Sequence, residues 1–463
     1  MSLRLREGSG ERRAPGTPEH RLECDPARAP LEPGRERGGL ELLEVLVWSL
    51  ILPHAWRIGD RSLPDKVARA HSPVVPHPRD SGMPATPPFR ILAQTAPGLE
   101  PLLVAELEAL GIRPRPLIGG AEWEGGWTDL FAANLHLRTA GRVLVEIASF
   151  RARALGELER KAGASGAGAF VPAGPLDLRV SCSRSRLSHR RAVEERVRRA
   201  LGRPPDEAPE GATRLLVRIH RDEVTLRLDS SGEHLHRRGY RSRIGEAPLR
   251  ETLAAAALLT VGWKGSEGPP PPLADPFCGS GTIPIEGALL AAGIPPGLAR
   301  PGLAARAYAF ERWPGFPAAE WQGFVEAARD RAGAVGDDPP PIVGSDRDAE
   351  VIEAARANAT DAGVEALVRF EVAPFTAAPL PSLPGWIVTN PPFGGRLGDR
   401  RSLRGLYRAL GRALRGPWEG WRIALFSADP ALPRHLGIPL EERLSLPVGG
   451  LRLRLHSGAD PRP

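Results

Sequence analysis

The segment VTNPPFGGRLGD, residues 388–399, combines residue types that can hold an amine in a fixed position. Asn390 offers a side-chain carbonyl oxygen and Pro391 a backbone carbonyl oxygen, so together they can accept both hydrogens of an exocyclic amine. This arrangement would direct the nitrogen lone pair at an electrophilic methyl group. The prolines stiffen the segment, and Phe393 supplies a flat face on which a base can stack. Asn-Pro turns are common, but the position directly after a predicted strand favours a catalytic motif formed by Asn390, Pro391, Pro392 and Phe393.

A glycine-rich turn, ADPFCGSGTIPIEGALL at residues 274–290, has the character of a cofactor loop. The turn follows a strand that ends at Asp275, and its glycines let the backbone approach a bulky ligand closely. Its spacing matches neither GxxxxGK(S/T) nor GxGxxG, so neither ATP nor NAD is favoured. An acidic strand end instead suits a cationic ligand, such as the amino-acid end of S-adenosylmethionine. The residues predicted to bind this cofactor are Asp275, Phe277, Gly279, Ser280, Gly281, Thr282 and Asp346.

Asp346 ends the next predicted strand, in VGSDRDAE. A carboxylate at this place can accept hydrogen bonds from both hydroxyls of a ribose. A lone aspartate before a helix is more often an N-cap. Because a cofactor loop precedes it, ribose binding is the favoured interpretation, and the two roles do not exclude each other.

The elements that must position these motifs alternate between strand and helix in the second half of the chain. Strands are predicted at 272–275, 341–346, 368–372, 386–389 and 421–428, with helices between them and a closing hairpin at 443–458. Strand–helix repeats with glycine turns predict an α/β fold with a Rossmann-like, doubly wound and mostly parallel sheet. The terminal hairpin would add an antiparallel edge to that sheet.

The first half has a different organisation. Residues 1–82 are rich in Arg, Pro, Gly and Glu, so we expect a mostly disordered leader, and a functional start at Met83 is one hypothesis. A β–α–α–β succession from Phe89 to Gly232 predicts a small α+β module, with an arginine-rich helix and a hairpin. The predicted parts are therefore the leader 1–82, a module at 83–232, a linker and helix at 233–265, and a catalytic domain at 266–463.

Composition and charge narrow the class of protein only partly. A net charge of +7 is compatible with a polyanionic partner, although a solvated basic surface is equally compatible. The three cysteines lie far apart and the histidines are scattered, so neither disulfides nor a metal site is predicted. The best apolar run, residues 42–56, is interrupted by Glu44 and is shorter than the roughly 20 residues a bilayer requires. We therefore expect a soluble, cytoplasmic protein with no membrane partner.

Several segments resemble one family of enzymes. DPFCGSGTIPIEGAL and TNPPFGGRLGD resemble the two signature motifs of class I S-adenosylmethionine-dependent methyltransferases that act on exocyclic amines. Residues 231–263 and 308–316 resemble the linker and insertion of the THUMP-domain RNA guanine-N2 methyltransferases, the RlmL-like branch. The module at 89–232 is similar to the ferredoxin-like plus THUMP region of that branch. The resemblance implies methyl transfer from S-adenosylmethionine to N2 of a guanosine in structured rRNA or tRNA.

The resemblance also assigns roles, with two departures. Asp275, Gly279 and Gly281 match the cofactor loop, Asp346 matches the ribose acid, and residues 390–393 match the catalytic motif. Phe393 stands where relatives often have tyrosine, which preserves stacking but removes a hydroxyl. Pro374 stands near the position of an acidic residue that would meet the adenine amine. Proline has no side-chain acceptor, so Pro374 cannot make that contact with the adenine amine.

RNA binding is predicted in the arginine-rich segment 183–203, because guanidinium groups at helical spacing can reach successive phosphates. A solvated helix face explains the composition equally well, and the THUMP resemblance favours RNA. A second basic stretch, residues 234–243, suits RNA contact and domain locking equally. The arginines predicted to bind RNA are Arg184, Arg186, Arg190, Arg191 and Arg198.

Two kinds of alternative to the RNA guanine-N2 methyltransferase stay open, another amine methyltransferase and a non-catalytic protein. NPP-aromatic motifs also serve DNA adenine-N6 and protein glutamine methyltransferases, although the module at 89–232 argues against both. A non-catalytic RNA-binding assembly factor is the other alternative, and Pro374 is the residue that favours it.

Overall fold

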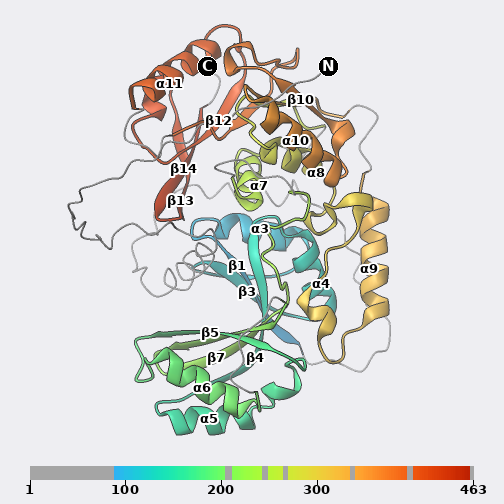
Figure 1. Ribbon diagram of the computed structural model, residues 1–463, viewed down its shortest axis with the longest axis vertical. Helices are drawn as coiled ribbons and strands as arrows, with labels where there is room; N and C mark the ends of the chain where they lie inside the picture. The colour runs from blue at the N-terminus through green and yellow to red at the C-terminus, as the bar shows by residue number, and fades with distance from the viewer. Residues whose placement is uncertain are drawn as a thin grey trace, which may run out of the picture. The chain divides into compact units, whose positions relative to one another are not determined.

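The computed structural model describes residues 88–203, 211–241, 249–263, 269–333, 339–393 and 400–458 (Figure 1). The strands in this part of the chain form two seven-stranded sheets, one before residue 230 and one after residue 272. The predicted leader, residues 1–82, lies outside the described residues.

The first sheet has the strand order β2-β3-β1-β4-β7-β6-β5. Its elements are β1 (Phe89–Thr95), α3 (Glu100–Ala109), β2 (Arg115–Leu117), β3 (Gly120–Gly125), α4 (Trp127–His136), β4 (Ala140–Arg151), α5 (Leu155–Ala164), β5 (Leu176–Ser183), α6 (Arg190–Ala200), β6 (Thr213–His220) and β7 (Glu223–Asp229). The strand β4 pairs antiparallel with β1 on one side and with β7 on the other, so it joins both halves of the sheet. Alternate residues of β6 are buried, and α5 and α6 pack against each other beside β5 (Figure 1).

The second sheet has the strand order β10-β9-β8-β11-β12-β14-β13. Its elements, with the preceding helix, are α7 (Glu251–Thr260), β8 (Leu273–Asp275), α8 (Thr282–Ala291), α9 (Ala318–Arg331), β9 (Ile342–Asp346), α10 (Ala349–Asp361), β10 (Val368–Val372), β11 (Trp386–Thr389), α11 (Arg400–Leu414), β12 (Arg422–Ser427), β13 (Glu441–Val448) and β14 (Leu451–Gly458). The strands from β10 to β12 are parallel, and the β13–β14 hairpin is attached antiparallel to β12. The predicted Rossmann-like fold with an antiparallel C-terminal hairpin is confirmed.

The connection between the strands explains where a ligand can bind. The chain continues from β8 to β9 on one side, whereas β11 takes the place on the other side of β8. Such a reversal of strand order opens a crevice at the carboxyl ends of the strands. The helix α7 is buried along its whole length and α8 at every position but the last, which agrees with their mostly apolar sequences. Among the described helices, none has the length and apolar run needed to cross a membrane.

Aromatic residues hold the segment 308–324 against α4. Phe131 of α4 lies 5.3 Å from the ring of Phe310 and 5.0 Å from that of Trp321, measured between ring centroids. The ring of Tyr308 stacks on that of Phe310, and its hydroxyl donates to the backbone carbonyl of Asn134. The insertion that follows α8 is therefore part of the packing around the first sheet.

A buried polar link connects the segment after β7 to α8. The guanidinium of Arg238 donates to Glu286 of α8 at 3.4 Å and to the backbone carbonyl of Arg138 at 2.6 Å. The Tyr240 hydroxyl donates to the same glutamate oxygen at 3.1 Å. Arg238, Tyr240 and Glu286 are fully buried. The basic stretch 234–243 suited RNA contact and domain locking equally. Arg238 and Tyr240 perform the second role, because their buried side chains link this segment to α8.

Candidate active site

The cofactor loop and the catalytic motif meet at the carboxyl ends of β8 and β11. Because these parallel strands are neighbours, Asp275 lies beside Thr389, and the threonine hydroxyl donates to Asp275 Oδ1 at 2.6 Å. The backbone N–H of Phe277 donates to the same oxygen at 3.1 Å. Asn390 follows Thr389 directly, so the position of the catalytic motif depends on this contact. Thr389 was not among the predicted site residues. Its position next to Asn390 in VTNPPF was the only signal in the sequence that could have indicated its role.

Asp275 is a buried carboxyl group without a cation beside it among the described residues. Burial raises the pKa of Asp275 to about 7, and the negative charge of Asp346 adds to this effect. The hydrogen bonds from Thr389 and Phe277 lower the pKa but do not offset the loss of hydration. A positively charged ligand group would stabilise the ionised form, so this observation fits the cationic amino-acid end of S-adenosylmethionine.

The glycine turn between β8 and α8 has a conformation that needs its glycines. Gly279 and Gly281 have φ angles of +54° and +86°. A Cβ on Gly281 would lie 2.8 Å from the ring of Phe370, whereas a Cβ on Gly279 would meet nothing within 4 Å. The Asn358 side chain donates to the Ser280 carbonyl at 3.0 Å and fixes the turn. The backbone at Gly279 is therefore the part of the turn that leaves space for a ligand.

The two predicted loop side chains Ser280 and Thr282 are buried. Ser280 contributes its backbone carbonyl to the contact with Asn358, and Thr282 is the first residue of α8. Asn358 of α10 was missed at the sequence level, because an asparagine within a helix gives no signal of its role.

The N-cap of α10 is Asp348, so Asp346 is not the helix cap. The side chain of Asp348 accepts from the backbone N–H groups of Glu350 and Val351. Asp346 Oδ2 accepts from the Gly279 N–H at 3.2 Å, and Oδ1 accepts from the Asp348 N–H at 3.2 Å. Asp346 is half-buried beside the glycine turn, which leaves it available for the predicted ribose contact.

Apolar groups occupy the region around Pro374. The ring of Phe375 stacks on that of Phe277, with 5.3 Å between the ring centroids, and the Val372 side chain is 50% exposed. Pro374 itself is exposed and precedes the short helix Phe375–Ala377. These side chains can provide an apolar wall for a flat ring, while the acidic acceptor expected from the resemblance is replaced by proline.

Asn390 carries a buried acceptor that no described residue satisfies. Its Oδ1 atom is inaccessible to solvent and has no hydrogen-bond partner in the part of the chain that the structure describes. Leaving such a group unpaired typically costs about 1–3 kcal/mol. Pro391 is buried, Pro392 is exposed, and Phe393 is half-buried against the apolar core on both sides. An amine N–H would complete this site.

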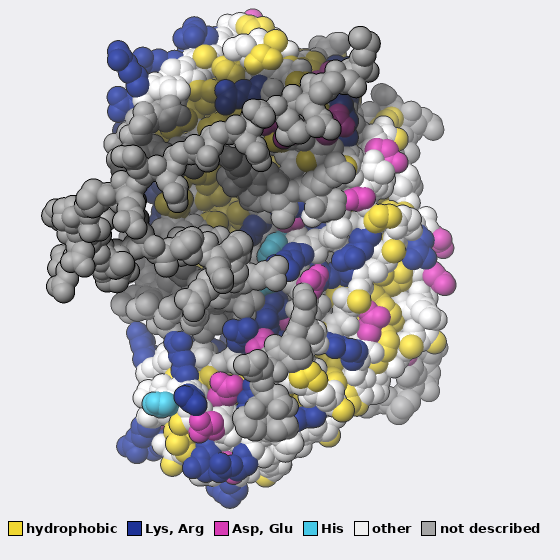
Figure 2. All heavy atoms as spheres, viewed as in Figure 1, with side chains coloured by type: hydrophobic (Ala, Val, Ile, Leu, Met, Phe, Trp, Pro, Cys, Tyr) yellow, Lys and Arg dark blue, Asp and Glu magenta, His cyan; other side chains and the backbone are white. Residues whose placement is uncertain are grey.

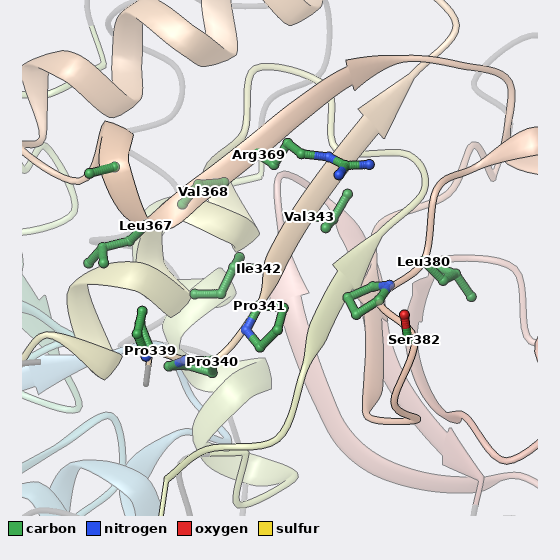
Figure 3. Close-up of a pocket in the computed structure, with 12 residues that line it drawn as sticks. Pro339, Pro340, Pro341, Ile342, Val343, Leu367, Val368, Arg369, Leu380 and Ser382 are labelled. Atoms are coloured by element: carbon green, nitrogen blue, oxygen red, sulfur yellow. The ribbon is translucent and has the colours of Figure 1, made fainter. Parts of the chain in front are cut away.

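A cavity of about 510 Å³ lies elsewhere, at the amino ends of β9 and β10 (Figure 3). Because the predicted site lies at the carboxyl ends of the strands, the cavity shares no residue with it. Its lining is mostly apolar and comes from residues Pro339–Val343, Ala366–Arg369 and Leu380–Ser382.

The five arginines predicted to bind RNA differ in their surroundings. Arg184 and Arg186 are exposed beside the β6–β7 turn, and Arg190 is half-buried at the start of α6. Arg191 is exposed, and its Nε atom lies 3.4 Å from Oε1 of Glu195. Arg198 is buried, where it donates to the Leu176 carbonyl at 3.0 Å and to Glu194 at 3.1 Å. Arg198 is therefore poorly placed to contact a phosphate.

No three His, Cys, Asp or Glu side chains gather as metal ligands among the described residues.

Two family models match this chain. Residues 238–439 match an RMKL-like methyltransferase domain, and residues 90–144 match the RlmL ferredoxin-like domain. A protein of Synechocystis sp. named "Putative RNA methyltransferase slr0064" is 32% identical over 370 residues, which are 78% of this chain and 94% of that protein. The chain belongs to the RMKL-like methyltransferase family.

Other relatives of this RMKL-like chain are longer, or have been solved with a ligand. The ribosomal RNA large subunit methyltransferase K/L of Syntrophotalea carbinolica is 38% identical over 391 residues. The match covers 80% of this chain and 53% of that protein, so the chain spans about half the length of its K/L relative. SMU.472, "a putative methyltransferase complexed with SAH", is 26% identical, with a TM-score of 0.70 and coverage of 82% of this chain and 100% of that one. The predicted S-adenosylmethionine dependence agrees with this family and with the bound S-adenosylhomocysteine.

Proposed function

We propose that this RMKL-like chain transfers a methyl group from S-adenosylmethionine to the exocyclic N2 amine of a guanosine in structured RNA. The product would be N2-methylguanosine. The observation that carries this proposal is the buried Oδ1 atom of Asn390, which has no hydrogen-bond partner among the residues that the structure describes and follows the Thr389–Asp275 contact. It supports an amine as the reacting group, held where a cofactor loop and a catalytic motif meet.

The residues predicted to hold the cofactor have surroundings that suit it. Bound S-adenosylmethionine would supply an electrophilic methyl group on a positively charged sulfur. Asp275 would bind the cationic amino-acid end, Asp346 the ribose, and the backbone of the Gly279 turn would lie against the ligand. Phe277 and Phe375 offer an apolar wall for the adenine ring, which supports binding despite Pro374.

In the proposed mechanism the protein orients the amine instead of activating it with a base. Asn390 Oδ1 and the Pro391 carbonyl accept one amine hydrogen each, which fixes the direction of the nitrogen lone pair. Phe393 stacks on the base after it leaves the RNA helix. The amine becomes more acidic once its nitrogen carries positive charge, so its proton can leave to solvent without a dedicated general base.

RNA is proposed as the substrate for two reasons. Residues 90–144 match the RlmL ferredoxin-like domain, within a module at 89–232 that resembles a ferredoxin-like plus THUMP region. Two relatives are named as RNA methyltransferases. Arg184, Arg186, Arg190 and Arg191 are proposed RNA contacts, and the cytoplasm is the proposed location. DNA adenine, protein glutamine and a purely structural role in RNA binding are the alternatives that the experiment must exclude.

The experiment compares the wild type with Asn390→Ala, using bacterial large-subunit rRNA and tRNA transcripts, labelled S-adenosylmethionine and nucleoside mass spectrometry. We expect N2-methylguanosine from the wild type and at least a hundredfold lower rate from the variant, with RNA binding retained. Label in N6-methyladenine or in glutamine would replace RNA guanine as the substrate. Near-normal turnover by Asn390→Ala would refute the mechanism, and a failure of the wild type to bind S-adenosylmethionine would favour the assembly factor.

A further inference from the structure

The helix that follows the catalytic motif, α11, has two distinct faces. Its buried side chains Leu403, Tyr407, Leu410 and Leu414 belong to the apolar core beside β12. Its exposed face carries arginine at positions 401, 404, 408 and 412. At 3.6 residues per turn, these four positions lie within about 80° of one another around the helix axis. We call these four residues the α11 arginine stripe.

No acidic side chain among the described residues neutralises the charges of the α11 arginine stripe. The helix contains no Asp or Glu, and none of the four arginines forms a hydrogen bond or ion pair with any described residue. In Figure 2, Lys and Arg side chains (dark blue) gather at the upper left, over α11. An unpaired row of guanidinium groups suits a ligand with a row of negative charges.

Helix α6 differs from α11, because most of its arginines are paired with glutamates. Its arginines at 191, 196, 198 and 199 each lie within 4 Å of a glutamate, either Glu159, Glu194 or Glu195. Arginine-rich composition therefore does not by itself produce an unpaired stripe in this chain. The exposed face of α11 is therefore more strongly positive than the exposed face of α6.

The α11 helix also lies close to the candidate active site. Its first residue, Arg400, comes seven positions after Phe393 in the sequence. The helix packs against the short helix Phe375–Ala377, whose Phe375 ring stacks on Phe277 of the cofactor loop. An RNA whose base reaches Asn390 can therefore bring its adjacent phosphates to α11.

We propose that the α11 arginine stripe binds backbone phosphates of the substrate RNA on one side of the reacting nucleotide. The inference rests on the proposed function only in taking RNA as the substrate. Neighbouring arginines of the stripe are about 4.5–6 Å apart along the helix axis, so several phosphates can be contacted at once. These contacts fix position without reading sequence.

The test replaces Arg404, Arg408 and Arg412 together by glutamine, which favours helix nearly as well as arginine. The logarithm of the association constant for RNA falls as the logarithm of the salt concentration rises. Each lost phosphate contact makes this slope less steep by about 0.7–0.9, so the loss of three contacts makes it less steep by about 2–3. The slope is measured by filter binding of a bacterial large-subunit rRNA transcript from 50 to 200 mM KCl. At 0.15 M salt, the Kd for RNA should rise roughly 10- to 100-fold.

The matched control is Arg113→Gln, Arg329→Gln and Arg331→Gln, which removes the same charge from exposed positions outside α11. The control should keep the RNA affinity and slope of the wild type, and both triple variants should keep its affinity for S-adenosylmethionine. The proposal is overturned if the α11 variant binds RNA like the wild type, or if the control loses as much affinity as the α11 variant. Because binding is measured apart from methylation, a wild type that binds RNA through α11 but makes no N2-methylguanosine would count against the proposed function alone.

Discussion

Replacing Asp275 by asparagine should stabilise the cofactor-free protein at alkaline pH while weakening its binding of S-adenosylmethionine. Asparagine has nearly the same shape and keeps an oxygen that can accept from the Thr389 hydroxyl and the Phe277 amide. The substitution removes the negative charge, which burial makes unfavourable. The carboxylate would thus be retained for binding at the expense of the stability of the free protein.

The expected change in the free energy of unfolding follows from the shift in the pKa of Asp275. Burial raises the pKa of Asp275 from 3.8 to about 7. A shift of about three units corresponds to about 4 kcal/mol, and local relaxation reduces the expected effect to about 1–3 kcal/mol. Because the folded-state pKa lies above the unfolded-state value, the stability that Asp275 contributes is complete below pH 3.8 and is lost as the pH rises through about 7.

The assay is thermal unfolding of the wild type and Asp275→Asn at pH 5 and pH 8.5, with and without S-adenosylmethionine. The wild type should lose more stability than the variant between the two pH values, and only the wild type should be stabilised strongly by the cofactor. Asp348→Asn is the control, because it removes an exposed carboxylate and asparagine preserves the helix cap. The reasoning is wrong if Asp275→Asn unfolds more readily than the wild type at pH 8.5.

Two further predictions concern the same site. The affinity of the wild type for S-adenosylmethionine should weaken by up to tenfold per pH unit as the pH falls below about 7, because Asp275 must lose a proton to bind a cation. Isothermal titration calorimetry from pH 6 to 8 measures this affinity. An affinity that does not change with pH contradicts the prediction. Gly281→Ala should destabilise the protein by about 1–3 kcal/mol and weaken cofactor binding, since its φ is +86° and its Cβ would lie 2.8 Å from Phe370. Gly323→Ala, at an open helical position, is the matched control and should be neutral or stabilising.

The sequence allowed the fold class and the grouping of the two motifs to be predicted, because both depend on local patterns. Strand–helix alternation indicated a doubly wound sheet, and carboxyl ends of parallel strands share one edge. The partner of Asp275 could not be predicted, since the placement of β11 beside β8 depends on long-range strand order. The N-cap role belongs to Asp348, two residues beyond the predicted ribose ligand, because its side chain accepts from the first backbone N–H groups of α10.

The surface charges were harder to interpret from sequence. Helical spacing identified arginines on α6 and would equally have identified those on α11, since both helices are rich in this residue. Whether an arginine is paired depends on acidic side chains from other elements, such as Glu159 of α5 beside Arg196. The burial of Arg198 against the Leu176 carbonyl likewise results from packing of α6 on β5.

The contact of Arg238 with Glu286 has a consequence for how the protein can be divided. Cutting the chain before residue 266 would remove the arginine and leave the glutamate of α8, with its side chain fully buried, without its cation. Breaking a buried ion pair from one side typically costs about 3–5 kcal/mol. We therefore expect the methyltransferase half to be insoluble or unfolded when expressed alone, so that the border predicted at residue 266 would not be a border of independent folding.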